Sequence, residues 1–228
     1  MPKLVWDAPG KHFYETGVDQ GVLFVQNDDG TYQNGVVWNG LTQVSLNPTG
    51  AEATDLWADN IKYLSLMSAE ELEATVEAYT YPDEWAACDG SVALATGLNI
   101  FQQPRKGFAL CYRTKIGNDV VGSEYGYKIH IIYNAKASPS ERAYETINDT
   151  PDAITFSWDI TTTPVPVTGY KPTAHVEIDS TKFNTTALEA KLTSIENSLY
   201  GTDGSGQTTG TESTLLMPDD IKGIITAQ

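Results

Sequence analysis

Residues Gly126 to Val165 read GYKIHIIYNAKASPSERAYETINDTPDAITFSWDITTTPV, and this stretch decides the fold of the chain. Apolar and polar side chains alternate near its beginning and again near its end. This is the period of two expected of a strand that buries one face. The apolar positions are Tyr127, Ile129, Ile131 and Tyr133 in the first run, and Ile154, Phe156, Trp158 and Ile160 in the second. The block therefore predicts two long strands.

Between these strands, the sequence Ser138-Pro139-Ser140-Glu141 is typical of a helix start. A serine cap accepts a hydrogen bond from a free backbone N–H, proline suits the first helical position, and a glutamate three residues after the cap closes a capping box. We therefore expect a short helix from Pro139 to about Asn148, flanking the sheet.

The first half of the chain is punctuated by turn dipeptides, namely Asp29-Gly30, Asn34-Gly35 and Asn39-Gly40. Glycine and asparagine adopt positive φ at little cost, so these pairs favour tight hairpin turns between antiparallel strands. The segment from Asn47 to Asn60 is different, because it is polar, rich in turn residues and longer than a simple hairpin needs. We interpret it as an extended loop of the kind that carries function. Together these patterns predict a mainly β protein with antiparallel strands.

Residues Ser68 to Tyr81 fit two patterns. Ser68 and Glu71 are spaced as a helix cap and its partner, whereas the apolar side chains from Leu72 to Ala78 alternate with polar ones as in a strand. The run then enters Tyr79-Thr80-Tyr81, which prefers strand. We favour a strand, which would place Glu71, Glu73 and Glu77 in one row on a solvent face.

The C-terminal part, residues 181–228, has the pattern of a helix followed by a flexible segment. Leu188, Leu192, Ile195 and Leu199 recur at helical spacing, after a capping-box candidate at Thr186 to Glu189 and before a C-cap glycine, Gly201. A helix this short needs packing to be stable, so it is expected to dock on its own domain or on a neighbour. We accordingly divide the chain into a β domain, residues 1–180, and a C-terminal segment with a Gly/Thr/Ser-rich loop and a docking tail.

The charge balance narrows the possible functions. Thirty acidic against fourteen basic residues give a formal net charge of −16, which opposes binding to nucleic acid. Two interpretations remain open: the acidity serves solubility, or it forms a surface that must not retain nucleic acid. The sequence has no run long and apolar enough to span a bilayer and no N-terminal secretory pattern. We expect a soluble protein made in a cytoplasm, with Cys88 and Cys111 as free, buried thiols.

Motifs that carry chemistry are missing from the sequence. His12, His130 and His175 are widely separated, and no zinc-site spacing, calcium loop, phosphate-binding loop or nucleophile elbow is present. We expect no enzyme, no metal and no cofactor. One alternative is a carbohydrate-binding β-sandwich module, for which Trp57 and Trp85 are the candidate platforms because both lie in expected loops.

As a whole, the chain resembles the major tail protein, or tail tube protein, of bacteriophages with long non-contractile tails (siphophages). The resemblance is spread over about residues 1–180 and does not rest on one signature. The stretches that carry it are LVWDAPGKHFYETGVDQGVLF, GVVWNGLTQVSLNPTGAEATDLWADNIKYLSL, EAYTYPDEWAACDG, QQPRKGFALCYRTKIGND and the opening block. It implies a β-sandwich or barrel with a flanking helix, in subunits that form hexameric rings stacked into a virion tube.

The resemblance also implies partners and contact residues. The partners are further copies of the chain, the tape-measure protein inside the tube, and the tail tip and tail terminator proteins; DNA passes through without specific binding, and assembly takes place in the host cytoplasm. The long loop would bridge one ring to the next through Asp55, Leu56, Trp57 and Asp59, unless it folds against its own domain with Trp57 buried. The acidic row Glu71, Glu73 and Glu77 would contribute to the lumen and repel DNA.

Overall fold

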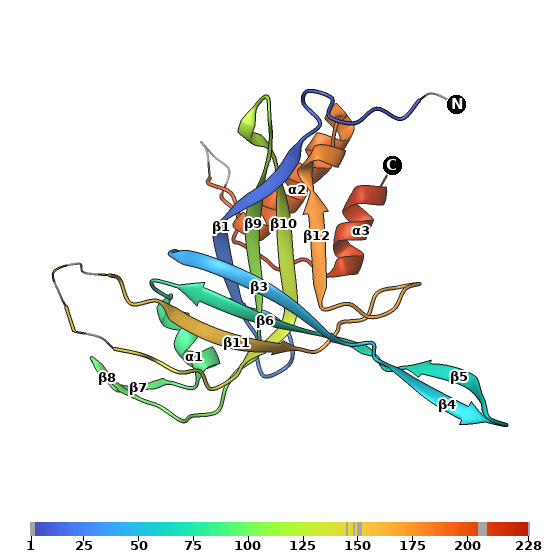
Figure 1. The fold of residues 1–228 in the computed structure, drawn as a ribbon. Coiled ribbons are helices and arrows are strands. Elements are labelled where there is room, and N and C mark those ends of the chain that lie inside the picture. Colours follow the sequence, from blue (N-terminus) through green and yellow to red (C-terminus); the bar gives the residue numbers. More distant parts are fainter. Residues whose placement is uncertain (1–2, 145, 148, 150–151, 205–208, 228) are drawn as a thin grey trace.

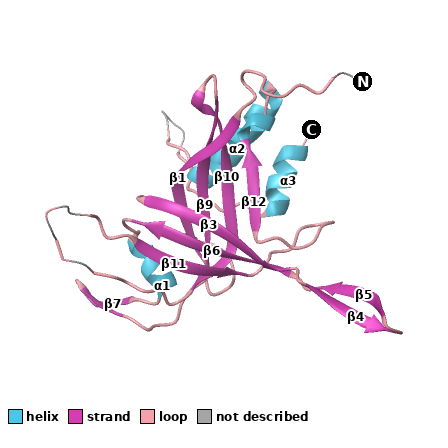
Figure 2. Cartoon of the chain, in the orientation of Figure 1, coloured by secondary structure: helices cyan, strands magenta, loops and turns pink. Residues whose placement is uncertain are grey.

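The computed structural model describes residues 3–144, 146–147, 149, 152–204 and 209–227. In that part of the chain the protein is mainly β, and every strand pair is antiparallel (Figures 1 and 2). The strands are β1 (Phe13–Val25), β2 (Val36–Trp38), β3 (Leu41–Gly50), β4 (Ala53–Ala58), β5 (Ile61–Met67), β6 (Glu70–Ala78), β7 (Val92–Ala95), β8 (Leu98–Ile100), β9 (Phe108–Asn118), β10 (Gly122–Ala137), β11 (Phe156–Thr162) and β12 (His175–Asp179). The helices are η1 (Asp83–Trp85), α1 (Ala86–Asp89), η2 (Ser180–Lys182), α2 (Thr186–Tyr200) and α3 (Pro218–Thr226).

The main sheet has the order β2-β1-β9-β10-β11-β6-β3, and β12 also pairs with β10. Strand β10 serves both halves of this sheet because it changes partner along its length. It pairs with β12 through Lys128–Ile132 and with β11 through Ala135–Ala137. Between them, Asn134 has a positive φ of 46° and the pairing with β9 shifts register, as at a β-bulge. The bulge bends the sheet, so that β3, β6 and β11 cross over β1, β9 and β10 (Figure 1).

One hydrophobic core fills the space between these two halves. Its centre is a group of three tryptophans, Trp38, Trp85 and Trp158, whose ring centroids are 4.6 to 5.6 Å apart. Trp85 is fully buried because η1 and α1 carry it into the core, so the expectation that it lies in an exposed loop is wrong. Other side chains buried in this core include Leu23, Ala74, Val76, Phe108, Leu110, Ile132 and Ile160.

A second core lies on the opposite face of β1, β9, β10 and β12, under helices α2 and α3. The helical spacing predicted this helix correctly: α2 buries Leu192, Ile195 and Leu199 against the sheet. Its cap is Thr185, one residue before the expected position, and the Thr185 side chain accepts a hydrogen bond from the Leu188 N–H at 3.3 Å. Helix α2 thus docks on its own chain. The result is three layers: the helices α2 and α3, then β1, β9, β10 and β12, and then β3, β6 and β11.

The expected short helix at Pro139 to Asn148 is wrong. None of the described residues in that range is helical, while Glu145 and Asn148 lie outside the described part. Ser138 continues the pairing with β11, since its N–H donates to the Asp159 carbonyl at 2.8 Å. The Ser140 hydroxyl accepts from the Asp159 N–H at 3.2 Å, so both Ser138 and Ser140 bind the neighbouring strand where a helix start was expected.

Both ends of the opening block are strands, as the alternation predicted. The second strand begins at Phe156, and Ile154 lies before it and is exposed. In β10 both sets of alternating side chains are buried around the middle of the strand: Ile129 and Ile131 face the helices, while Ile132 faces the tryptophan core. The strand therefore forms part of both cores.

Candidate functional site

A long β-hairpin, formed by β4 and β5, projects from the end of β3 and β6 and extends away from the body of the protein (Figure 1). The expected loop from Asn47 to Asn60 is therefore strand for most of its length, with β3 ending at Gly50 and β4 beginning at Ala53. At the neck, the Ser68 N–H donates to the Glu52 carbonyl at 3.2 Å. Strands β4 and β5 pair only with each other in the described part of the chain.

The projecting hairpin has an unusually apolar surface. Leu56 pairs with Leu64, and Leu66 follows two residues later on the same face of the ribbon. Trp57 is 69% exposed, so the alternative in which this segment folds back and buries Trp57 is wrong. The other exposed large apolar side chains of the hairpin are Ile61, Tyr63 and Met67. Exposed large apolar side chains gathered on one element in this way are typical of a contact site for another molecule.

The two acidic residues of the expected contact set have local roles. The Asp55 carboxylate forms an ion pair with Lys62 Nζ at 2.7 Å and accepts a hydrogen bond from the Ser65 hydroxyl. Both contacts lower the pKa of Asp55. Asp59 and Asn60 both have positive φ, 52° and 64°, and form the two-residue loop between paired Ala58 and Ile61. Such a loop has the twist of a type I′ hairpin turn. Leu56 and Trp57 therefore add exposed apolar surface to the hairpin, while Asp55 and Asp59 shape it.

The segment that fitted two patterns, Ser68 to Tyr81, contains a strand, β6, as favoured. Its alternate residues Ala74, Val76 and Ala78 are buried in the tryptophan core, so the acidic row Glu71, Glu73 and Glu77 lies on the opposite, outer face of the sheet. Polar side chains flank the row on both neighbouring strands. They are Gln43, Ser45, Asn47 and Thr49 on β3, and Ser157, Asp159 and Thr161 on β11. The outer face of these three strands is a hydrophilic, acidic wall.

A second projecting hairpin, β7–β8, lies in a part of the sequence where no strand is predicted. It extends on the side of the molecule opposite to β4–β5 (Figure 1). Its side chains Val92, Leu94, Leu98 and Ile100, with Phe101 beyond it, are all exposed. The short alternating run of valine, alanine and leucine around Thr96-Gly97 was the signal that could have revealed it.

The titratable groups inside the described part of the chain form no reactive or metal-binding cluster. Among them is a histidine pair, in which His130 Nδ1 lies 3.2 Å from His175 Nε2 and the rings are stacked. Glu177 borders the pair, 3.9 Å from His130, and forms an ion pair with Lys128 at 3.1 Å. Burial, followed by the neighbouring His175, lowers the pKa of His130 to about 4. Cys88 and Cys111 are free and buried, as predicted, and burial raises the pKa of each thiol to about 12. The two histidines and the two thiols are neutral at neutral pH.

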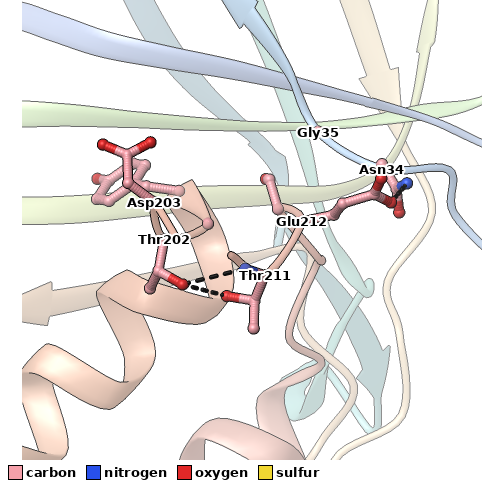
Figure 3. Close-up of a pocket in the computed structure, with 9 residues that line it drawn as sticks. Asn34, Gly35, Thr202, Asp203, Thr211 and Glu212 are labelled. Atoms are coloured by element: carbon pink, nitrogen blue, oxygen red, sulfur yellow. Dashed lines mark hydrogen bonds between the residues drawn. The ribbon is translucent and has the colours of Figure 1, made fainter. Parts of the chain in front are cut away.

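The most polar surface depression lies where the chain leaves α2 (Figure 3). Thr202 and Thr211 face each other there, with their hydroxyl oxygens 2.8 Å apart, and Asn34 donates to the Glu212 carboxylate. Tyr200 also lines the depression, and its hydroxyl has no hydrogen-bond partner among the described residues. The described part of the lining contains no histidine, cysteine, lysine or arginine.

No protein-family model matches this chain, and no curated protein matches it. Within the described residues, no helix is both long and apolar enough to cross a membrane. The distinctive features of the molecular surface are the two apolar hairpins, β4–β5 and β7–β8, and the acidic wall.

Proposed function

We propose that this chain is a structural virion protein that polymerises into the tail tube of a bacteriophage with a long non-contractile tail. Six copies would form a ring, and stacked rings would form the conduit for DNA. The observation that carries the proposal is the β4–β5 hairpin, which projects from a completed fold and exposes Leu56 and Trp57 to solvent. A hairpin that contributes nothing to its own core is suited to bridge to the next ring.

Two further features support a closed polymer. The outer edges of β3 and β12 pair with no other strand in the described part of the chain, and unpaired strand edges favour pairing with another copy. The acidic row Glu71, Glu73 and Glu77 would line the conduit. Six copies would carry a formal charge of −96, six times −16, and such a lumen would disfavour adsorption of DNA phosphates.

The partners proposed from the resemblance are the tape-measure protein, which would occupy the growing tube, and the tail tip and tail terminator proteins at its two ends. Assembly would take place in the cytoplasm of the host, and the finished protein would reside in the virion. DNA would pass through the tube without a specific binding site.

The test is electron microscopy of the purified protein, together with a variant that lacks the hairpin. Residues 53–67 are replaced by Asn-Gly, a two-residue turn that fits because Glu52 and Ser68 already face each other at the neck. We expect hollow tubes from the natural chain, and from the variant a folded chain that forms no tubes. Val37→Ser, which removes an exposed apolar side chain from β2, is the matched control and should still form tubes.

Two results would overturn the proposal. One is a natural chain that stays monomeric over the whole accessible concentration range, and the other is a hairpin-less variant that still forms tubes. Retardation of the monomer in polysaccharide gels, lost in Trp57→Ala, would favour the carbohydrate-binding module instead.

A further inference from the structure

The β7–β8 hairpin lies in the least acidic part of the chain. From Gly90 to Asn118 the sequence contains no aspartate or glutamate, although the whole chain has thirty, and this segment includes Arg105 and Lys106. The hairpin itself carries no charge, and its tip exposes Leu94 and Leu98, which are 65% and 51% accessible. It is thus an uncharged apolar surface in a part of the chain that lacks acidic residues, while Arg105 and Lys106 are bound within the protein, Arg105 to the Ala137 carbonyl and Lys106 to the Asp28 carboxylate.

The base of this hairpin is fixed to the body of the protein. The Gln103 N–H donates to the Gly90 carbonyl at 3.0 Å, which closes the base of the hairpin. Arg142, from the segment after β10, forms an ion pair with the buried Asp89 and places its guanidinium 5.4 Å from the ring centre of Phe101. These contacts hold the apolar tip in a defined position, so its surface is formed before any partner arrives.

The two apolar hairpins cannot meet within one molecule, because they project from opposite sides of the fold (Figure 1). A contact between two different surfaces of identical chains is heterologous, and each chain can then donate with one surface and accept with the other. Such contacts continue from copy to copy. This geometry is the one that a polymer needs.

We propose that the β7–β8 hairpin of one copy is the docking surface for the β4–β5 hairpin of the next copy. The inference rests on the proposed function and specifies which surface receives the bridging hairpin. The β7–β8 hairpin is the favoured docking surface because two chains of net charge −16 repel each other least where one of them presents no acidic residue. The donor hairpin is itself nearly neutral, since Lys62 pairs with Asp55 and Asp59 is the one other charged residue between Ala53 and Met67.

The experiment uses two variants of the full chain that each lack one surface. Trp57→Glu removes the donor surface, and the double substitution Leu94→Glu with Leu98→Glu removes the acceptor surface. All three positions are exposed, so both variants should have the same melting temperature as the natural chain. Each variant alone should assemble at least about tenfold less readily than the natural chain, because an aromatic anchor or its pocket is lost. Val120→Glu, at an exposed turn between β9 and β10, is the control for added charge.

Mixing the two variants gives the decisive result. Each mixture partner retains the surface that the other lacks, so analytical ultracentrifugation should detect a one-to-one dimer that neither variant forms alone. A mixture that remains monomeric, or an acceptor variant that assembles like the natural chain, overturns the inference. If the natural chain itself never assembles, the proposed function fails first, and the two failures are thereby distinguished.

Cysteine crosslinking gives a second and independent readout. The natural thiols are buried, so Trp57→Cys and Leu94→Cys introduce the reactive pair. We expect the doubly substituted chain to form a disulfide-linked ladder on oxidation, and Trp57→Cys with Val120→Cys to form none. An equal ladder from both would also contradict the docking surface.

Discussion

Replacing Arg142 by alanine should destabilise the protein more than any other single loss of charge in the described part of the chain. The guanidinium forms an ion pair with Asp89, whose side chain is only 4% exposed, and it also lies 5.4 to 6.0 Å from three ring centres. Removing one partner of a buried pair leaves the other charge uncompensated and costs about 3–5 kcal/mol. The three ring contacts are those to Tyr81, Phe101 and Phe156.

Ser91 limits this loss without removing it. Its N–H and hydroxyl donate to the Asp89 Oδ1 atom at 3.1 and 2.8 Å, whereas Arg142 binds Oδ2. One carboxylate oxygen therefore keeps its partners and the other loses its only donor among the contacts described. We expect a loss of about 3 kcal/mol, at the lower end of the range for a broken buried pair.

The assay is urea denaturation followed by tryptophan fluorescence, because Trp85 is buried next to this pair in sequence and structure. Lys115→Ala breaks an ion pair with Glu124 that is exposed on both sides, and this control should change the free energy of unfolding by less than about 1 kcal/mol. Adding Asp89→Asn to Arg142→Ala should recover part of the loss, since the buried charge is then gone. A loss below about 1 kcal/mol for Arg142→Ala, or no recovery in the double variant, would refute this reasoning.

Three other predictions follow from the same structure. Replacing all three members of the acidic row by lysine should change the melting temperature by no more than a few degrees, because the row is on the outer face of the sheet. Assembled tubes of this variant should retain DNA in a filter assay. Variant tubes that do not retain DNA would mean that the row does not line the conduit. The pKa of His130 is about 4 in the fold against about 6.5 when unfolded, so the unfolded chain binds more protons between these values. Stability should therefore be fully present above pH 6.5 and fall by on the order of 2–3 kcal/mol towards pH 4. His130→Gln should flatten that slope in urea titrations at several pH values, and an unchanged slope would contradict the assignment. Both cysteines should resist a thiol reagent in the native protein and react once it is unfolded, whereas rapid native reaction would mean that the cores open readily.

Sequence pattern predicted the strands and the C-terminal helix because their burial is periodic. The alternation in β6 outweighed a plausible helix cap, since Ala74, Val76 and Ala78 all enter one core. The heptad-like spacing of Leu192, Ile195 and Leu199 identified α2 for the same reason. In each case the local preference and the tertiary packing agree.

Sequence pattern failed where distant partners decide the local structure. The capping residues at Ser138 to Glu141 would suit a helix, yet hydrogen bonds to Asp159 extend the strand pairing in their place. Trp85 lies among turn residues, and only the approach of Trp38 and Trp158 explains its burial. The segment from Asn47 to Asn60 was interpreted as a loop because it is polar and rich in turn residues, whereas the strand β4 within it forms by pairing with β5.

The distribution of burial separates folding from assembly in this chain. If neighbouring subunits were needed to complete the core, the sheet faces would expose apolar side chains, yet Ile129, Ile132 and Trp158 are all buried within the single chain. Many of the exposed large apolar side chains lie on the two projecting hairpins, Trp57 and Leu94 among them. Under the proposed function, removing a side chain from a projecting hairpin costs association, whereas removing one from either core costs stability. The proposed assembly surfaces can then be altered one at a time in a protein that still folds.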